Sequence, residues 1–206
     1  IVIINGQSAF HFAQPNLTQV KLTFRMSQNL IVIPVSINQS NAIRLVLDSG
    51  ISSTIISSLI EPGTIQVRSA RKIQIAGLGS GKTIDAYYSK GNQVRLSNER
   101  DTSRNITHSN LDVYILANDQ FNLSHQLGLP VNGLLGSTIF KDFIIKVSPV
   151  QKEITFFNRE AFSFKRRTRG FEKIPVMVID GKAYMDVGMV QEDRSVIVVR
   201  LLIDTG

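Results

Sequence analysis

Two short segments each place an aspartate between an apolar run and a hydroxyl-glycine pair. The first reads Leu-Asp-Ser-Gly around Asp48, and the second reads Ile-Asp-Thr-Gly around Asp204. Even a neutral polar group without a partner costs about 2–7 kcal/mol to bury, so a carboxylate at the end of a core strand indicates a chemical role. Two carboxylates about 3 Å apart can share one proton and exchange protons with a bound water. The structural alternative is a turn carboxylate that caps backbone amides.

The composition is that of a globular protein. The chain has 206 residues, 43% of them hydrophobic, and no apolar window approaches the roughly 18 residues that a membrane span needs. The absence of cysteine excludes disulfides and thiol nucleophiles, and His11, His108 and His125 lack metal-ligand spacing, so we expect no metal and no cofactor. Much of the net charge of +7 sits in the basic run 165–169, which we interpret as a solvated linker and not a nucleic-acid surface.

Alternating and β-branched segments dominate the first part of the chain and predict an all-β fold. A turn-forming Asn-Gln-Ser-Asn set separates residues 29–37 from 42–47, so these two segments should form an antiparallel hairpin that ends at Asp48. The strands predicted before residue 76 are 20–24, 29–37, 42–47, 54–56, 65–67 and 72–75.

A glycine-rich segment follows these strands and allows two interpretations. It comprises Gly77, Leu78, Gly79, Ser80 and Gly81, and it continues into Lys82-Thr83. This sequence matches a loosely defined phosphate-binding-loop motif, and such a loop requires a helix directly after it. Residues 84–90 contain two adjacent tyrosines and read as a strand, so we favour a glycine-rich hairpin tip. A nucleotide-binding protein remains the less favoured alternative.

The remainder of the chain also reads mainly as strands. We predict strands at 93–96 and 111–116 with a polar loop at 97–110 between them, and a short helix within 121–127. Further predicted strands are 144–147 and 153–157. Residues 174–178 then repeat the Ile-Pro-Val pattern of 33–37, and a hairpin of 183–191 and 195–203 leads to Asp204.

The ordered set of motifs resembles the retropepsin-like aspartic proteases, in particular exported bacterial forms with two lobes that are often followed by a PDZ domain. The resemblance covers residues 20–206 and implies a closed β-barrel or sandwich lobe with a hairpin flap and one or two short helices, plus the start of a similar second lobe. The expected organisation is an N-terminal segment at 1–19, a first lobe at 20–163, a basic linker at 164–173 and a truncated second lobe at 174–206.

The resemblance also implies a role for each motif. Asp48 and Asp204, one from each lobe, would activate water for peptide-bond hydrolysis, and a polypeptide would be the substrate. The expected supporting residues are Ser49 and Thr205, which would hydrogen-bond across the lobes; Gly50 and Gly206, which would leave room for backbone and substrate; Gly77 to Gly81, which would form the flap; and Leu134, Leu135 and Gly136, which would support the catalytic loop. Ile51 stands where the family usually has a small residue.

Several expectations concern the whole protein. A catalytically silent peptide-binding domain is the main alternative to an endopeptidase. We expect an extracytoplasmic location, periplasmic or secreted, with the signal peptide absent from this sequence, and we expect neither nucleic acid nor a membrane span. Because Asp204 lies close to the last residue, we expect the second lobe to be incomplete and the chain itself to be poorly active, unless two chains pair through Asp48 as a homodimer.

Overall fold

The computed structural model describes residues 9–57, 65–75, 83–98, 101–164 and 170–206. The fold is mostly β, with 54% strand and 6% helix, which confirms the predicted all-β class. Among the described residues, neither helix has the length or the apolar character that crossing a bilayer demands.

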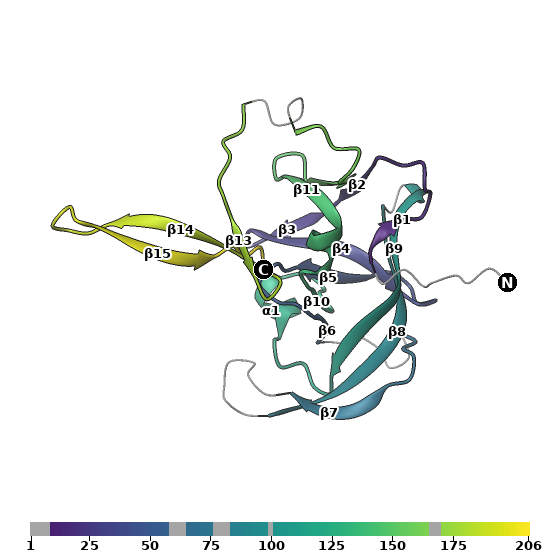
Figure 1. Cartoon of the computed structure of the whole chain (residues 1–206). Coiled ribbons are helices and arrows are strands. Elements are labelled where there is room, and N and C mark those ends of the chain that lie inside the picture. The colour runs from purple at the N-terminus through teal and green to yellow at the C-terminus, as the bar shows by residue number, and fades with distance from the viewer. Residues whose placement is uncertain (1–8, 58–64, 76–82, 99–100, 165–169) are drawn as a thin grey trace.

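Within the described ranges, six strands close into a barrel (Figure 1). They are β4 (Leu30–Ile37), β5 (Ile43–Leu47), β6 (Thr54–Ile56), β8 (Ile84–Asn98), β9 (Asp101–Leu116) and β10 (Gly133–Leu135). The barrel closes because β8 pairs with β4 on one side and with β9 on the other. The short strands β1 (His11–Phe12), β3 (Arg25–Ser27) and β7 (Arg71–Ile75) extend it through β9, β4 and β8. Closure leaves the barrel strands paired on both sides, which fixes their register.

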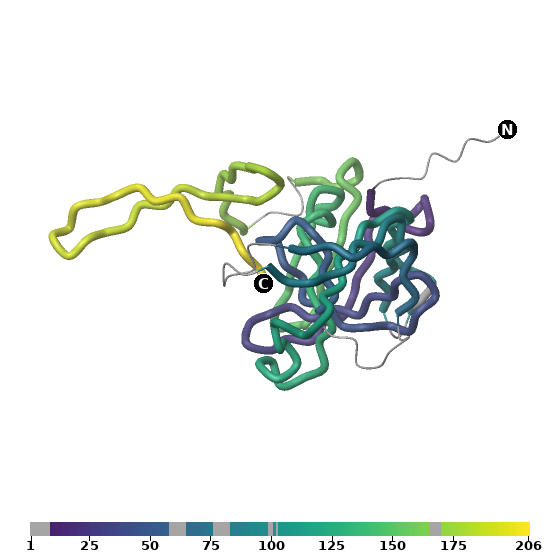
Figure 2. Tube along the Cα trace, turned by 90° about the horizontal axis from the view of Figure 1, so that it is seen from below, coloured from purple at the N-terminus to yellow at the C-terminus, as the bar shows by residue number. Residues whose placement is uncertain are grey.

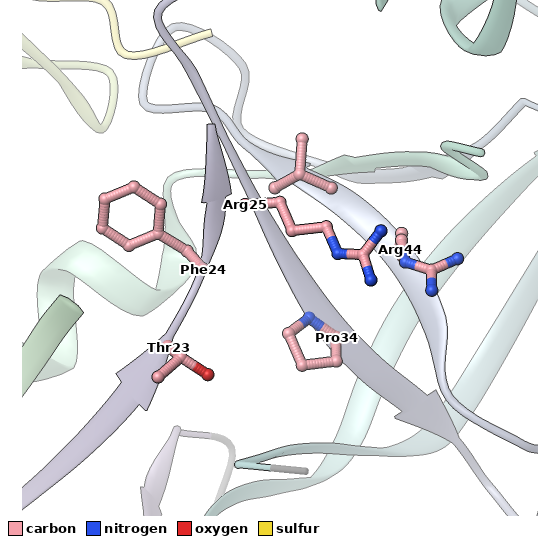
Figure 3. Close-up of a pocket in the computed structure, with 6 residues that line it drawn as sticks. Thr23, Phe24, Arg25, Pro34 and Arg44 are labelled. Carbon is pink, nitrogen blue, oxygen red and sulfur yellow. The ribbon is translucent and has the colours of Figure 1, made fainter. Parts of the chain in front are cut away.

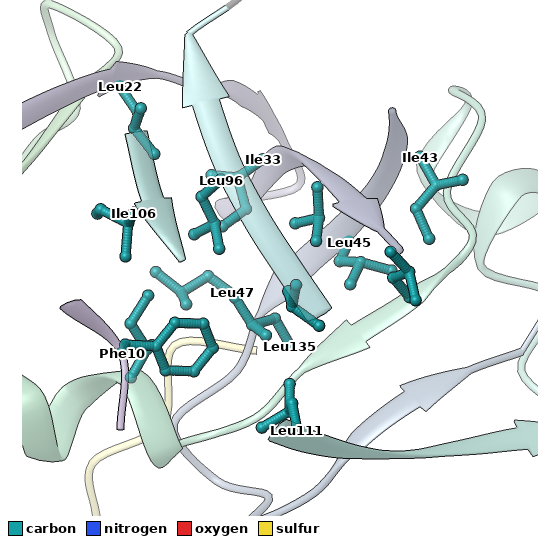
Figure 4. Packing of buried hydrophobic residues seen from close by; sticks show 14 of the residues in the cluster. Phe10, Leu22, Ile33, Ile43, Leu45, Leu47, Leu96, Ile106, Leu111 and Leu135 are labelled. Carbon is teal, nitrogen blue, oxygen red and sulfur yellow. The ribbon is translucent and has the colours of Figure 1, made fainter. Parts of the chain in front are cut away.

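The barrel interior is filled by aliphatic side chains from alternate strand positions (Figure 4). In β4, for example, Ile33, Val35 and Ile37 are buried while the residues between them are partly exposed. The largest fully buried aliphatic side chains of the other barrel strands are Leu45, Leu47, Ile56, Leu96, Ile106 and Leu135. The buried side chains of β5 therefore hold the strand that leads to Asp48 in a fixed position in the core.

The predicted hairpin before Asp48 is confirmed, and β10 lies beside it. Strands β4 and β5 pair antiparallel. Strand β10 then runs parallel to β5 and antiparallel to β6, so it lies between the two strands that flank the Asp48 loop. A strand far along the chain thus fixes both ends of that loop.

Two additional sheets complete the described structure. One contains β2 (Gln19–Thr23), β11 (Phe143–Ser148) and β12 (Glu153–Asn158), and the other contains β13 (Met177–Ile179), β14 (Lys182–Val190) and β15 (Val196–Leu202). The helices are α1 (Leu123–Leu127) and α2 (Thr138–Asp142). The β14–β15 hairpin projects from the barrel, whereas the last residues return to it (Figures 1 and 2).

Two predicted segments were wrong. Residues 97–110 were expected to form a loop, but most of this segment belongs to the long β8–β9 hairpin. Its polar side chains lie largely outward, while Ile106 and His108 are buried on the other face. Residues 65–67 were expected to form a strand, but they do not pair with one. The side-chain amide of Asn38 donates a hydrogen bond to the Gln66 carbonyl and holds this segment in place.

The glycine-rich segment Gly77–Gly81 lies outside the described residues, but the strands on either side of it are described. Strands β7 and β8 pair antiparallel from Arg71↔Tyr88 to Ile75↔Ile84. Strand β8 therefore occupies the position at which a phosphate-binding loop would require a helix. This finding contradicts the nucleotide-binding alternative.

Substituting Gly133 should destabilise the barrel more than substituting a glycine in open space. A Cβ at Gly133 would lie 1.9 Å from the Ile55 carbonyl oxygen, whereas a Cβ at Gly128, which has φ +65°, would meet no atom within 4 Å. We expect Gly128→Ala to lose about 1–2 kcal/mol from backbone strain, and Gly133→Ala at least about 3 kcal/mol from overpacking. Urea unfolding followed by circular dichroism measures both losses, and equal losses would contradict this packing.

Candidate active site

Asp48 begins a tight turn at the end of β5. Its amide donates to the Leu135 carbonyl at 3.0 Å, which ties the turn to β10. One carboxylate oxygen, Oδ1, accepts the amides of Gly50 at 2.7 Å and Ile51 at 3.1 Å. Asp48 is only 7% exposed. The carboxylate thus does cap its own turn, as the structural alternative required, but the bonds from Gly50 and Ile51 use only one of its two oxygens.

Asp204 occupies a turn of the same kind after β15. The Gly206 amide donates to Asp204 Oδ1 at 3.0 Å, which parallels the bond from Gly50 to Asp48. The Ile203 amide donates to the Ala183 carbonyl at 2.8 Å, so the β14–β15 hairpin holds the approach to this turn. The two Asp-hydroxyl-Gly segments therefore have matching local geometry.

Ser49 and Thr205 join the two turns through reciprocal hydrogen bonds. The Ser49 amide donates to Thr205 Oγ1 and the Thr205 amide donates to Ser49 Oγ, each at 3.1 Å. Each hydroxyl also donates to a carbonyl of the opposite strand end, Ser49 Oγ to Ile203 at 2.9 Å and Thr205 Oγ1 to Leu47 at 2.8 Å. Hydroxyl side chains at both positions are needed, because each acts as donor and acceptor at once.

The glycine of each signature leaves space for the aspartate of the other. A Cβ built on Gly50 would lie 2.4 Å from Asp204 Oδ2, and a Cβ built on Gly206 would lie 2.5 Å from Asp48 Cγ. Any side chain at either glycine would therefore displace a carboxylate. The structure brings together Asp48, Asp204 and the four supporting residues that the sequence singled out.

The site disfavours two negative charges at once. Burial raises the pKa of the Asp48 carboxyl above its ordinary value of 3.8, and the amides of Gly50 and Ile51, which donate to it, oppose that rise. The Asp204 carboxylate raises the pKa of Asp48 further, through charge repulsion and a side-chain hydrogen bond. Two carboxyl groups this close can hold one proton between them, which belongs to the pair and not to either residue.

The segment after β10 braces the outer side of the Asp48 loop. The Ser137 amide donates to the Ile51 carbonyl at 2.7 Å, and Thr138 Oγ1 donates to the Ser52 carbonyl at 3.3 Å. A Cβ at Gly136 would lie 2.6 Å from the Ser53 carbonyl oxygen, so the two backbones approach as closely as glycine permits. Leu134, Leu135 and Gly136 thus lie where a loop-supporting strand was expected.

A pocket of about 430 Å³ opens beside the Asp48 loop. Its lining residues come from the loop, from β6, β7 and β9, and from the start of β14; they are Ile51, Ser52, Ser53, Ile55, Ile75, Tyr114 and Lys182. Sequence reasoning singled out only Ile51 among them. Ser52 and Ser53 follow it in the loop, and the other four residues come from separate strands that no local sequence pattern connects. A smaller pocket of about 70 Å³ beside Pro34 and Arg44, on the outer side of β4 and β5, is too small for a peptide segment (Figure 3).

Metal binding has little support at this site. Within the described ranges, no three histidine or carboxylate side chains gather as a metal site would need. The arrangement of two carboxyl groups instead suits proton transfer to and from a bound water.

A closed barrel that presents an aspartate turn, braced by a strand ending in Leu-Leu-Gly, has the architecture of a retropepsin-like lobe. The family model described as aspartyl protease matches residues 33–139, just over half of the chain. The chain therefore belongs to the aspartyl protease family. The matched region includes Asp48 and β10, and Asp204 lies outside it. A search of curated proteins found no match.

Removing the Thr205 hydroxyl should loosen the contact between the two turns. Thr205→Val leaves the Leu47 carbonyl and the Ser49 amide without a partner, and each unsatisfied group costs about 1–3 kcal/mol. We expect the Ser49 and Thr205 amides to exchange with deuterium at least about tenfold faster in this variant. Thr205→Ser, which keeps the hydroxyl, is the matched control. Equal exchange rates in Thr205→Val and the wild type would show that the hydroxyl does not hold the turns together.

Proposed function

We propose that the protein is an aspartic endopeptidase in which Asp48 and Asp204 activate a water molecule. The single observation that carries this proposal is the reciprocal hydrogen bonding of Ser49 and Thr205, which supports a paired arrangement of the two carboxyl groups. Membership of the aspartyl protease family supports a protease-like function for the barrel.

The chemistry requires one carboxylate and one carboxylic acid. The carboxylate takes a proton from the bound water as the water oxygen attacks the scissile carbonyl, and the acid donates its proton to the carbonyl oxygen. The first carboxyl group, now protonated, then donates its proton to the amide nitrogen while the second takes a proton from a diol hydroxyl, and the carbon–nitrogen bond breaks to give an acid and an amine. The raised pKa of Asp48 favours the singly protonated pair in mild acid. Activity should therefore fall as rising pH removes the shared proton.

We further propose that β13 to β15 form part of a second lobe. Like β4 and β5, these strands lead into an Asp-hydroxyl-Gly turn. Most of their large apolar side chains are exposed in this chain; those of Val178 and Val198 are about 70% exposed. Such a face is typical of a sheet that packs against further strands. Asp48 and Asp204 would then come from different lobes.

Two other features belong to the same proposal. The segment that joins β7 to β8 in the sequence, which contains Gly77–Gly81, would serve as the flap over a bound polypeptide, because Ile75 at the end of β7 lines the pocket beside the Asp48 loop. The extracytoplasmic location is proposed from the resemblance to exported bacterial two-lobe proteases.

Replacing either aspartate should remove peptidase activity. Asn keeps the shape of the side chain but cannot exchange the proton, so Asp48→Asn and Asp204→Asn should each lower kcat by about 10²–10⁴-fold or more. The measurement is the pH profile of kcat/KM on an unstructured polypeptide. Asp193→Asn, in the exposed turn between β14 and β15, is the matched control and should retain activity.

The outcomes separate the candidate functions. Full activity in either active-site variant would contradict the two-aspartate mechanism. Tight binding of a statine-containing peptide without cleavage of any polypeptide between acidic and neutral pH would instead favour a catalytically silent peptide-binding domain.

A further inference from the structure

We propose that the pocket beside the Asp48 loop binds a substrate side chain, and that Lys182 at this pocket favours a glutamate there. The proposal rests on the proposed peptidase function, because it names a preference of the same site. The pocket has a volume of about 430 Å³, which is sufficient for one extended side chain and its neighbouring backbone.

The pocket is continuous with the loop that carries the candidate catalytic carboxylate. The Ile51 amide donates to Asp48 Oδ1 at 3.1 Å, and the Ile51 carbonyl accepts the Ser137 amide at 2.7 Å. Ile51 is therefore held from both sides, and its side chain forms a fixed wall. An extended peptide advances about 3.3 Å per residue, so a residue near the scissile bond can reach this wall.

The floor of the pocket is apolar and anchored in the fold. Ile55 is 7% exposed and packs with Ala86 and Leu116 in a small core cluster. The partly buried side chains of Ile51, Ile75 and Tyr114 pack against the same cluster. Because the floor belongs to a packed core, it offers a stable surface for the methylene groups of a bound side chain.

Lys182 supplies a positive charge to this apolar pocket. It is partly exposed at the start of β14, and it pairs through its backbone with Ile179. Among the described residues, Lys182 has no carboxylate partner, whereas Lys72 on β7 is paired with Asp85 at 3.0 Å. A glutamate combines two methylene groups for the isoleucine floor with a carboxylate that could pair with the Lys182 ammonium.

The test compares pairs of peptide inhibitors that differ only in carrying Glu or Gln at one position. A set of statine-containing peptides would carry Glu or Gln at each of the positions around the statine in turn. Their Kd values would be measured for the wild type and for Lys182→Met, which removes the charge and keeps an apolar stem. Lys141→Met is the matched control, because Lys141 Nζ lies near Gly181 but does not line the pocket. Thermal unfolding verifies that both variants remain folded.

At one position, the wild type should bind the Glu peptide about fivefold more tightly than the Gln peptide, as expected for a partly exposed ion pair. This ratio should fall to about one in Lys182→Met and persist in Lys141→Met. The proposal is overturned if no position shows a Glu preference, if the preference survives in Lys182→Met, or if it disappears equally in Lys141→Met. Absence of any peptide binding overturns it as well.

Cleavage of the corresponding ordinary peptides distinguishes this proposal from the peptidase function. A Lys182-dependent Glu preference in binding, without cleavage, would keep the pocket proposal and contradict the peptidase. Cleavage without that preference would keep the peptidase and contradict the pocket proposal.

Discussion

The reciprocal hydrogen bonds between Ser49 and Thr205 are the interaction on which the candidate site depends. They connect residues 156 positions apart in the chain and join two turns that each carry an aspartate. Without them, the segment after β15 would have no fixed position relative to Asp48. With them, each carboxyl group lies in the space left by the other signature's glycine. The burial and repulsion that raise the pKa of Asp48 follow from this arrangement.

The barrel supplies the rigidity that these bonds require. Leu45 and Leu47 are fully buried, and β10 lies between β5 and β6, so the backbone around Asp48 has little freedom. Side chains in a packed interior cannot shift without creating voids or overlaps, so the core constrains the loop at its mouth. Gly133 and Gly136 contribute by permitting the close approach of β10 to the neighbouring backbone.

The sequence located the two aspartate turns better than it located some of the strands around them. Each Asp-hydroxyl-Gly turn has a short local sequence motif, and the motif occurs twice, so the pairing of the two turns could be anticipated. Residues 97–110 could not be recognised as strand, because their polar side chains lie largely outward and the burial of the other face comes partly from a contact with Phe10, which is distant in sequence. Pocket residues such as Tyr114 and Lys182 also have no shared sequence signal, since only the closed barrel and the β14 hairpin bring them together.

The most direct test of the account is the pKa of the Asp48 carboxyl, measured by carbon-detected NMR in the wild type and in Asp204→Asn. If the two carboxyl groups face each other within one chain, the pKa of Asp48 lies above its ordinary value of 3.8 in the wild type. Removing the charge of Asp204 then lowers that pKa, although burial keeps part of the rise. An Asp48 pKa that is unchanged in Asp204→Asn would contradict the paired site.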